Sequence, residues 1–150
     1  MTVQVKVRRV RENADLPLPR YQTAQAAGLD LQADLTEPLV LGSLERRLVP
    51  TGLSIELPGT HEAQIRPRSG LALKQGLTCL NSPGTIDADY RGEIMVLLFN
   101  ASNQAVTINR GDRIAQMVVA PVTRVELVEA TDLSDSDRGA GGFGSTGRAG

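Results

Sequence analysis

The sequence predicts an all-β fold, a jelly-roll-like sandwich or barrel with one short helix. Short runs of apolar residues, several of them alternating with polar ones, recur along most of the chain. Proline, glycine, asparagine and aspartate separate these runs as turn signals, at a spacing that is typical of a sandwich or jelly roll. Only one segment combines a helix start signal with a helix stop signal.

The expected strands are short and follow one another along the chain. They cover residues 3–7, 28–33, 47–57, 63–66, 94–100, 105–108 and 114–128. Turn signals between them include Pro58-Gly59 and Pro83-Gly84. Because proline has no N–H to donate to a β-ladder, we expect Pro121 to divide the last run into two strand segments.

The helix expected at residues 69–75 has Ser69 placed to cap its start and Gly76 placed to end it. After residue 130 the chain turns acidic and then glycine-rich, with no apolar period. We therefore expect residues 1–130 to form the β domain and residues 131–150 a flexible linker and tail. The tail would lose much backbone entropy on ordering, so we expect it to stay mobile until a ligand holds it.

The composition excludes several classes of function. A net charge of −1 and a pI near 5.8 provide no basic surface for a nucleic-acid polymer. No apolar run is long enough for a membrane span and the start lacks a signal peptide's apolar block, so we expect a soluble, cytoplasmic protein without a membrane partner. Cys79 and His61 are the only cysteine and histidine, which leaves oxygen ligands for any metal. We expect Cys79 as a small core residue, and Arg8, Arg9 and Arg11 on a solvated face.

The glycine-rich segment 138–147 carries groups that suit a nucleotide with several phosphates. Successive glycines let backbone N–H groups converge on an anion, and Ser145 and Thr146 add hydroxyl donors. Arg138 adds charge-assisted donors, and Phe143 offers a flat face for a base. The alternative is a disordered tail without a ligand.

The segment 84–94 places Asp87, Asp89 and Tyr90 between glycines, in what we interpret as a hairpin. In an extended chain the two carboxylates share a face, and either could serve as a general base for water or as an oxygen ligand for magnesium. The alternative is that both aspartates only form a turn.

Three other segments carry candidate polar groups. Arg68 and Ser69 lead into the helix, where free N–H groups would face an anion; the alternative is an ordinary N-cap beside solvated arginines. Asp30 lies in an apolar strand pattern, where a charge is costly unless it is paired or lies near a metal. Asp34 is interpreted as a turn residue, and Gln116 as either a ligand contact or a satisfied polar residue.

Five segments in order resemble the five motifs of the trimeric dUTP diphosphatase (dUTPase) family. They are AGLDL at 27–31, RPRSGLALK at 66–74, GTIDADYRGEI at 84–94, RGDRIAQM at 110–117 and RGAGGFGSTG at 138–147. The segment 48–53 is also similar to a stretch of that family, whereas Leu29 departs from the residue that many members carry. Each motif is weak alone, but the ordered set spans nearly the whole chain and favours a catalytic role for Asp87 over a turn.

The resemblance implies an enzyme that hydrolyses dUTP to dUMP and pyrophosphate, which limits uracil incorporation into DNA and supplies dUMP for dTTP synthesis. It also implies jelly-roll subunits in a threefold homotrimer, with each active site built from all three chains and closed by a tail. Asp87 would orient and deprotonate the water that attacks the α-phosphorus. Asp30 would help to hold Mg²⁺ through its water shell.

The same resemblance implies a set of substrate-binding residues. In this set Arg68, Ser69 and Gln116 contact the phosphate chain, and Arg138, Ser145 and Thr146 of the tail hold its distal end. Phe143 stacks on uracil, Asn81 reads the base and Tyr90 lies against the deoxyribose. The set is Arg68, Ser69, Gly70, Asn81, Asp87, Tyr90, Gln116, Arg138, Phe143, Gly144, Ser145 and Thr146.

Two other functions remain open at this point. Deoxycytidine triphosphate deaminases share the fold that the resemblance implies, although the Asp-Ala-Asp-Tyr and Phe-Gly-Ser-Thr segments are typical of the diphosphatases. A nucleotide-sensing module on the same scaffold would bind dUTP without hydrolysing it.

Overall fold

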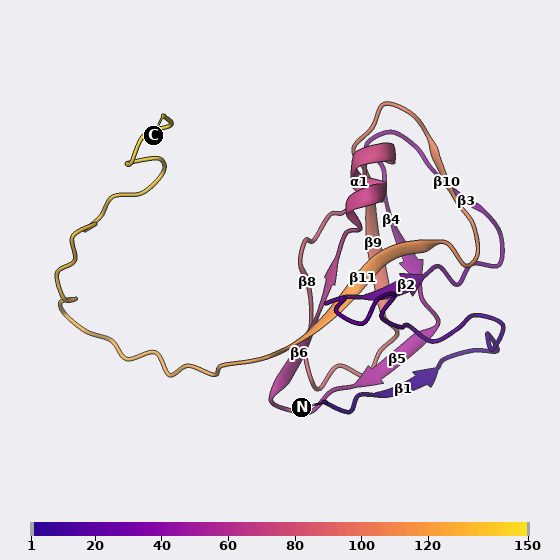
Figure 1. Ribbon diagram of the computed structural model, residues 1–150, viewed down its shortest axis with the longest axis horizontal. Helices are drawn as coiled ribbons and strands as arrows, with labels where there is room; N and C mark the ends of the chain where they lie inside the picture. The colour runs from indigo at the N-terminus through magenta and orange to yellow at the C-terminus, as the bar shows by residue number, and fades with distance from the viewer. Residues whose placement is uncertain (1, 150) are drawn as a thin grey trace.

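The computed structural model describes residues 2–149 as a β-rich body with one short helix and a long C-terminal extension (Figure 1). The strands are β1 (Lys6–Arg9), β2 (Leu29–Gln32), β3 (Leu39–Leu41), β4 (Arg46–Pro50), β5 (Leu53–Glu56), β6 (His61–Arg66), β7 (Leu77–Cys79), β8 (Gly84–Ile86), β9 (Met95–Asn100), β10 (Val106–Ile108) and β11 (Arg113–Pro121), and the helix is α1 (Ser69–Gln75). The all-β prediction with one short helix is confirmed. No helix within residues 2–149 is long and apolar enough to cross a membrane.

The strands form four antiparallel groups. The largest sheet has the order β2-β11-β6-β8, a second has the order β4-β9-β7, and β1-β5 and β10-β3 are separate pairs. Within residues 2–149, no strand is paired with the next strand along the chain. The longest strand, β11, lies between β2 and β6 and therefore joins early and middle segments of the sequence.

Alternating side chains of these strands build an aliphatic core. In β9, Val96, Leu98 and Asn100 point inward and are almost fully buried, as the period of two predicts. Cys79 of β7 belongs to this core, and its burial raises the pKa of the thiol to about 11. The expectation that Cys79 is a small core residue is confirmed.

Several expected strands differ from those observed. The run 47–57 is interrupted at Gly52, which has a φ of 71° and separates β4 from β5. β11 ends at Pro121, and residues 122–128 form no strand, so the expected second segment is wrong. These residues are exposed, and among them Val122 makes a backbone hydrogen bond, to the carbonyl of Thr60.

The hairpin expected at 84–94 is also wrong. β8 pairs with β6, whereas β9 pairs with β4 and β7, so the intervening residues connect two different sheets. Asp87 follows the end of β8 and Asp89 lies in the turn, so the two carboxylates do not share the face of one strand.

The helix has the predicted bounds but a different cap. Arg68 occupies the N-cap position and no side chain caps the helix there, because Ser69 is already its first helical residue. Gly76 ends the helix as predicted, in the left-handed conformation with a φ of 66°, and its N–H donates to the carbonyl of Ala72 at 3.1 Å.

Replacing Gly76 by alanine should destabilise the fold by about 1–2 kcal/mol, the usual cost of a left-handed non-glycine residue. A Cβ at Gly76 would also lie 3.0 Å from the backbone nitrogen of Ser102 and 2.9 Å from its Cβ. Urea unfolding measures the difference. Gly59→Ala is the control, because a Cβ at Gly59 meets nothing within 4 Å, and an equal loss of stability there would contradict this explanation.

Candidate functional site

Asp30, Arg68, Arg113 and Gln116 form a group that we call the β11 polar cluster. Gln116 of β11 lies opposite Asp30 of β2, and Asp30 accepts a hydrogen bond from Arg113 Nη1 at 3.2 Å. Arg68 Nε lies 3.6 Å from the Asp30 carboxylate, and the Gln116 amide donates to the carbonyl of Pro67 at 3.0 Å. The register of three strands thus brings three predicted site residues together.

A glycine of the first motif makes room for this cluster. A Cβ at Gly28 would lie 2.3 Å from Gln116 Oε1 and 3.1 Å from Gln116 Cβ. Any other residue would therefore displace the Gln116 side chain. Sequence reasoning did not single out Gly28 as part of the site, and its place inside the first motif was the available signal.

Arg113 is a second residue of the cluster that sequence reasoning missed. The pairing of β11 with β2 shifts register between Arg113 and Ala115, and the Arg113 guanidinium reaches Asp30. Its position three residues before Gln116 in the fourth motif was the available signal. Ser69 and Gly70 lie beside the cluster at the start of α1, and both are exposed.

Asp87 lies on the loop that follows β8, which we call the Asp87 loop (residues 87–93). The Tyr90 N–H donates to the carbonyl of Asp87 at 3.1 Å, and the Tyr90 hydroxyl donates to the carbonyl of Glu93 at 2.9 Å. Gly92 lies under the Tyr90 ring, since a Cβ at Gly92 would be 2.4 Å from the Tyr90 hydroxyl. The loop is therefore a compact turn that leaves the Asp87 and Tyr90 side chains exposed.

The Asp87 loop and the β11 polar cluster line different cavities. Asp87, Asp89 and Arg91 line one of about 520 Å³. Arg68 and Arg113 line a second cavity of about 470 Å³, which contains none of the loop residues. Asn81 lies in the turn before β8, where its amide nitrogen would be 3.0 Å from a Cβ at Gly84. The expected base, Asp87, and the expected phosphate ligand, Arg68, thus line two different cavities of one chain.

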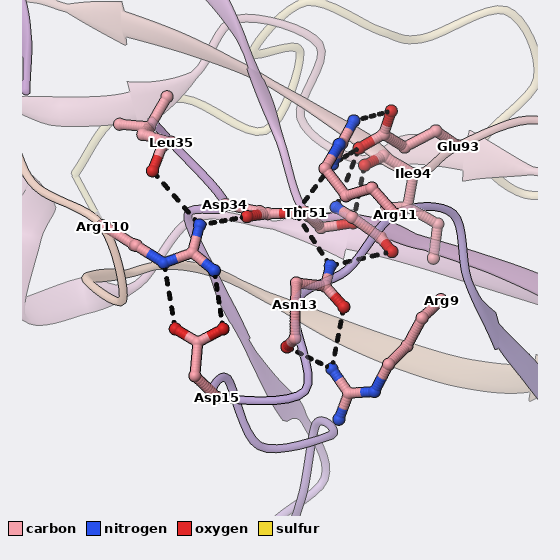
Figure 2. A network of polar contacts seen from close by, with 11 residues as sticks. Arg9, Arg11, Asn13, Asp15, Asp34, Leu35, Thr51, Glu93, Ile94 and Arg110 are labelled. Carbon is pink, nitrogen blue, oxygen red and sulfur yellow. Dashed lines mark hydrogen bonds and ion pairs between the residues drawn. The ribbon is translucent and has the colours of Figure 1, made fainter. Parts of the chain in front are cut away.

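Asp34 is a buried acceptor in a polar network, which corrects its interpretation as a turn residue (Figure 2). Its side chain is 1% exposed and accepts hydrogen bonds from Arg11 at 2.7 Å, from Asn13 at 2.8 Å and from Arg110. Arg11 also pairs with Glu93, at the end of the Asp87 loop, so it does not lie on a purely solvated face. Burial opposes the charge of Asp34, but these hydrogen bonds outweigh it and hold the pKa of the carboxyl below its ordinary value.

The C-terminal extension leaves the body after Val122, whose N–H donates to the carbonyl of Thr60 at 2.9 Å (Figure 1). In the described part of the tail, the hydrogen bonds of Arg138, Gly141 and Ser145 stay within the tail itself. The structure therefore does not bring the tail's site residues to the other site residues. They are Arg138, Phe143, Gly144, Ser145 and Thr146.

Comparison with known proteins identifies the family of this architecture. A family model described as dUTPase matches residues 14–147. The chain belongs to the dUTPase family. It is 64% identical over 148 residues to the deoxyuridine 5'-triphosphate nucleotidohydrolase of Cytophaga hutchinsonii, covering 99% of this chain and 94% of that protein. It is 60% identical over 149 residues to the protein of the same name from Anaeromyxobacter sp., covering 99% of this chain and 100% of that one.

Solved dUTPase structures share the fold. The Staphylococcus bacteriophage 80alpha dUTPase with dUPNHPP superposes with a TM-score of 0.87 at 24% identity, covering 98% of this chain and 100% of that one. A mutant dUTPase from phage phi11 of S. aureus, described as coordinating a structural Mg(II) ion, has a TM-score of 0.78 at 22% identity and covers 88% of this chain and 99% of that one. The β-rich body is thus the fold of known dUTPases.

Asp34→Asn should lower the free energy of unfolding by about 2 kcal/mol at pH 7, because two arginines lose a buried anionic partner. The folded-state pKa of Asp34 is depressed, so its contribution is complete above the unfolded carboxyl pKa of about 4 and is lost as the pH falls through the folded value. Urea unfolding at neutral and acidic pH should therefore show that the native and variant proteins converge in acid.

The control for this experiment is Glu56→Gln, which removes the exposed ion pair between Lys6 and Glu56 at 3.0 Å. Because this pair is exposed to solvent, we expect a much smaller pH-dependent difference from the native protein than for Asp34→Asn. A constant difference between native protein and Asp34→Asn from neutral to acid would contradict the assigned charge on Asp34.

Proposed function

We propose that this protein hydrolyses dUTP to dUMP and pyrophosphate, which keeps uracil out of DNA and supplies dUMP for dTTP synthesis. The observation that carries the proposal is 58–64% identity, over nearly the full chain, to proteins named deoxyuridine 5'-triphosphate nucleotidohydrolase. Since this substrate belongs to the nucleotide pool, we place the enzyme in the cytoplasm.

Asp87 is proposed as the general base that orients and deprotonates the attacking water. Its side chain is exposed on a compact loop, and no ion pair within residues 2–149 involves it. A carboxylate in this setting is available to accept a proton from water at the α-phosphorus. The electrons of the new P–O bond come from that water, and pyrophosphate leaves with the electrons of the broken bond.

The β11 polar cluster is proposed to bind the phosphate chain. Arg68 presents a planar fork of donors, and the Gln116 amide and the exposed Ser69 hydroxyl add neutral donors nearby. Gly70 leaves room beside them, since a Cβ there meets nothing within 4 Å. Phosphoryl transfer requires positioning and charge stabilisation more than covalent catalysis, so these groups suffice together with a metal ion and one base.

Asp30 is suited to hold a hydrated magnesium ion. Mg²⁺ retains several waters and is usually bound by one or two carboxylates together with substrate phosphates. Residues 2–149 contain no group of three or more histidine, cysteine, aspartate or glutamate side chains that could form a full protein cage. Gln32 lines the same cavity as Asp30, and its buried Oε1 accepts no hydrogen bond from any of residues 2–149, so it could accept one from such a water. When bound, the ion would neutralise charge on the phosphates.

Asn81, with the backbone beside β8, is proposed to read uracil, and Tyr90 to pack against the deoxyribose. Uracil presents an acceptor at O4 and a donor at N3, whereas cytosine reverses both. A site that pairs with the uracil edge would therefore leave buried groups unpaired with cytosine. The Tyr90 ring, held over Gly92, would leave no space for a 2′-hydroxyl.

We further propose a threefold homotrimer of jelly-roll subunits in which each site uses several chains. The separate cavities of Asp87 and Arg68 support this, because neither cavity alone holds the base and the phosphate ligand. Exposed apolar side chains such as Val125 at 76% and Leu127 at 93% would be covered by association. The tail of residues 131–149 would stay mobile until Phe143 stacks on uracil and Arg138, Gly144, Ser145 and Thr146 bind the distal phosphates of a neighbour's site.

Asp87→Asn should lower kcat for pyrophosphate release from dUTP at least about 100-fold, because the amide cannot accept the proton from water. The native protein should release pyrophosphate rapidly from dUTP and slowly from dCTP, dTTP and UTP, all measured with magnesium. Ammonia release from dCTP would indicate a deaminase instead. Tight dUTP binding without hydrolysis by the native protein would indicate a sensing module.

Mixing two inactive variants tests the shared site. Asp87→Asn and Arg68→Ala should each be inactive alone, whereas subunits unfolded and refolded together in equal amounts should recover up to about one quarter of native activity. One quarter is the share of sites in which Asp87 comes from an Arg68→Ala subunit and Arg68 comes from an Asp87→Asn subunit, if the subunits mix at random. Refolding each variant by itself is the control, and no recovery in the mixture would place both residues in one chain's site.

A further inference from the structure

We propose that Arg11, Asp34 and Glu93, here called the Arg11 cluster, are positioning residues that hold the Asp87 loop in its working geometry (Figure 2). The proposal rests on the proposed function, because it concerns how Asp87 and Tyr90 are placed. None of the three residues belongs to the β11 polar cluster. They act through the loop backbone.

Glu93 connects the loop to the rest of the body. Arg11 donates two parallel hydrogen bonds to the Glu93 carboxylate, both at 2.8 Å, and the N–H of Gly52 donates a third at 2.8 Å. The backbone carbonyl of the same Glu93 accepts the hydrogen bond from the Tyr90 hydroxyl. One residue thus faces the body with its side chain and faces Tyr90 with its backbone.

Arg11 is itself held from the opposite side. Its Nη1 also donates to Asp34 at 2.7 Å, and the Asp34 side chain is 1% exposed. Asn13 and Arg110 supply the remaining hydrogen bonds to Asp34. Any rotation of Arg11 would leave a buried carboxylate short of a donor, which is costly, so the guanidinium is confined to one position.

The loop has little other support. The side chains of Asp87, Asp89, Tyr90 and Arg91 are exposed, and only Ala88 of the loop packs partly against the core. The other ties are polar: for example, the Ser54 hydroxyl donates to the carbonyl of Arg91 at 2.6 Å. The position of the loop therefore depends on hydrogen bonds, and the charged ones are the strongest of these.

Displacement of the Asp87 loop should affect the rate of hydrolysis more than the binding of substrate. A base that must reach a bound water loses much of its effect when it is displaced by about 1 Å. The substrate's phosphates, in contrast, are bound by residues of the β11 polar cluster. Loosening the Arg11 cluster should therefore reduce kcat more than it raises KM.

The test uses the chain's tyrosines as reporters. The sequence has two tyrosines and no tryptophan, so Tyr21→Phe leaves Tyr90 as the sole strong fluorophore. Tyr21 is exposed at 52% and lies outside the proposed site. In that background, Glu93→Gln removes the charge but keeps the size of the side chain and an acceptor for the N–H of Gly52.

We expect Glu93→Gln to lower the fluorescence anisotropy of Tyr90, to reduce kcat for dUTP about tenfold and to change KM less than about twofold. Arg11→Lys should retain more activity than Arg11→Ala, because lysine keeps the positive charge, although it lacks the guanidinium that donates two parallel hydrogen bonds. Glu56→Gln, which breaks the exposed pair with Lys6, should change none of these quantities.

Two results would overturn the proposal. One is a folded Glu93→Gln protein with native anisotropy and native kcat, and the other is equal activity of Arg11→Lys and Arg11→Ala. Measuring the anisotropy does not require hydrolysis, so the effect of the Arg11 cluster on the Asp87 loop is tested even if the native protein does not hydrolyse dUTP. In that event the proposed function is wrong, and the anisotropy of Tyr90 alone decides whether Glu93 holds the loop in place.

Discussion

The structure depends on the burial of one charged group, Asp34. A carboxylate that is almost completely removed from water must be surrounded by donors, and Asp34 obtains them from Arg11, Asn13 and Arg110. The first two donors lie in the segment after β1, and the third lies just before β11. Because the Asn13 amide also donates to the carbonyl of Gly52, the same network reaches the turn between β4 and β5. The network thereby adds side-chain hydrogen bonds between segments that flank the paired strands β1–β5 and β2–β11.

This arrangement places the two halves of the proposed site on one framework. The Asp87 loop is fixed at its end through Glu93, while Arg110 lies three residues before Arg113 of the β11 polar cluster. The framework is polar and the surrounding core is aliphatic, so the two parts respond to different conditions. Hydrophobic packing holds the sheets, and charge holds the loops that carry the proposed chemistry.

The sequence predicted those features that depend on local pattern. The helix at 69–75 and the strand near 94–100 were predicted, because capping glycines and a period of two are local signals. Four strands have only three residues, which is too short to show a period: β3, β7 and β8 were missed, whereas β10 was predicted from the run 105–108. The hairpin at 84–94 was wrong, since turn residues look the same whether the flanking strands pair with each other or with distant ones. The order of motifs identified Asp30, Arg68 and Gln116, but their contact depends on strand register, and Asp34 was missed because burial of a charge depends on partners far away in sequence.

The place of β11 at the centre of its sheet has a consequence for synthesis of the chain. β2 and the β6-β8 pair are made early, yet within residues 2–149 β2 has no partner in this sheet other than β11. Until residue 121 has left the ribosome, β2 and one edge of β6 expose unpaired backbone and apolar side chains such as Leu31 and Ile65, which are buried in the finished fold. Pairing in this sheet must therefore wait for nearly the whole domain, and until then its strand edges are open to pairing with other chains.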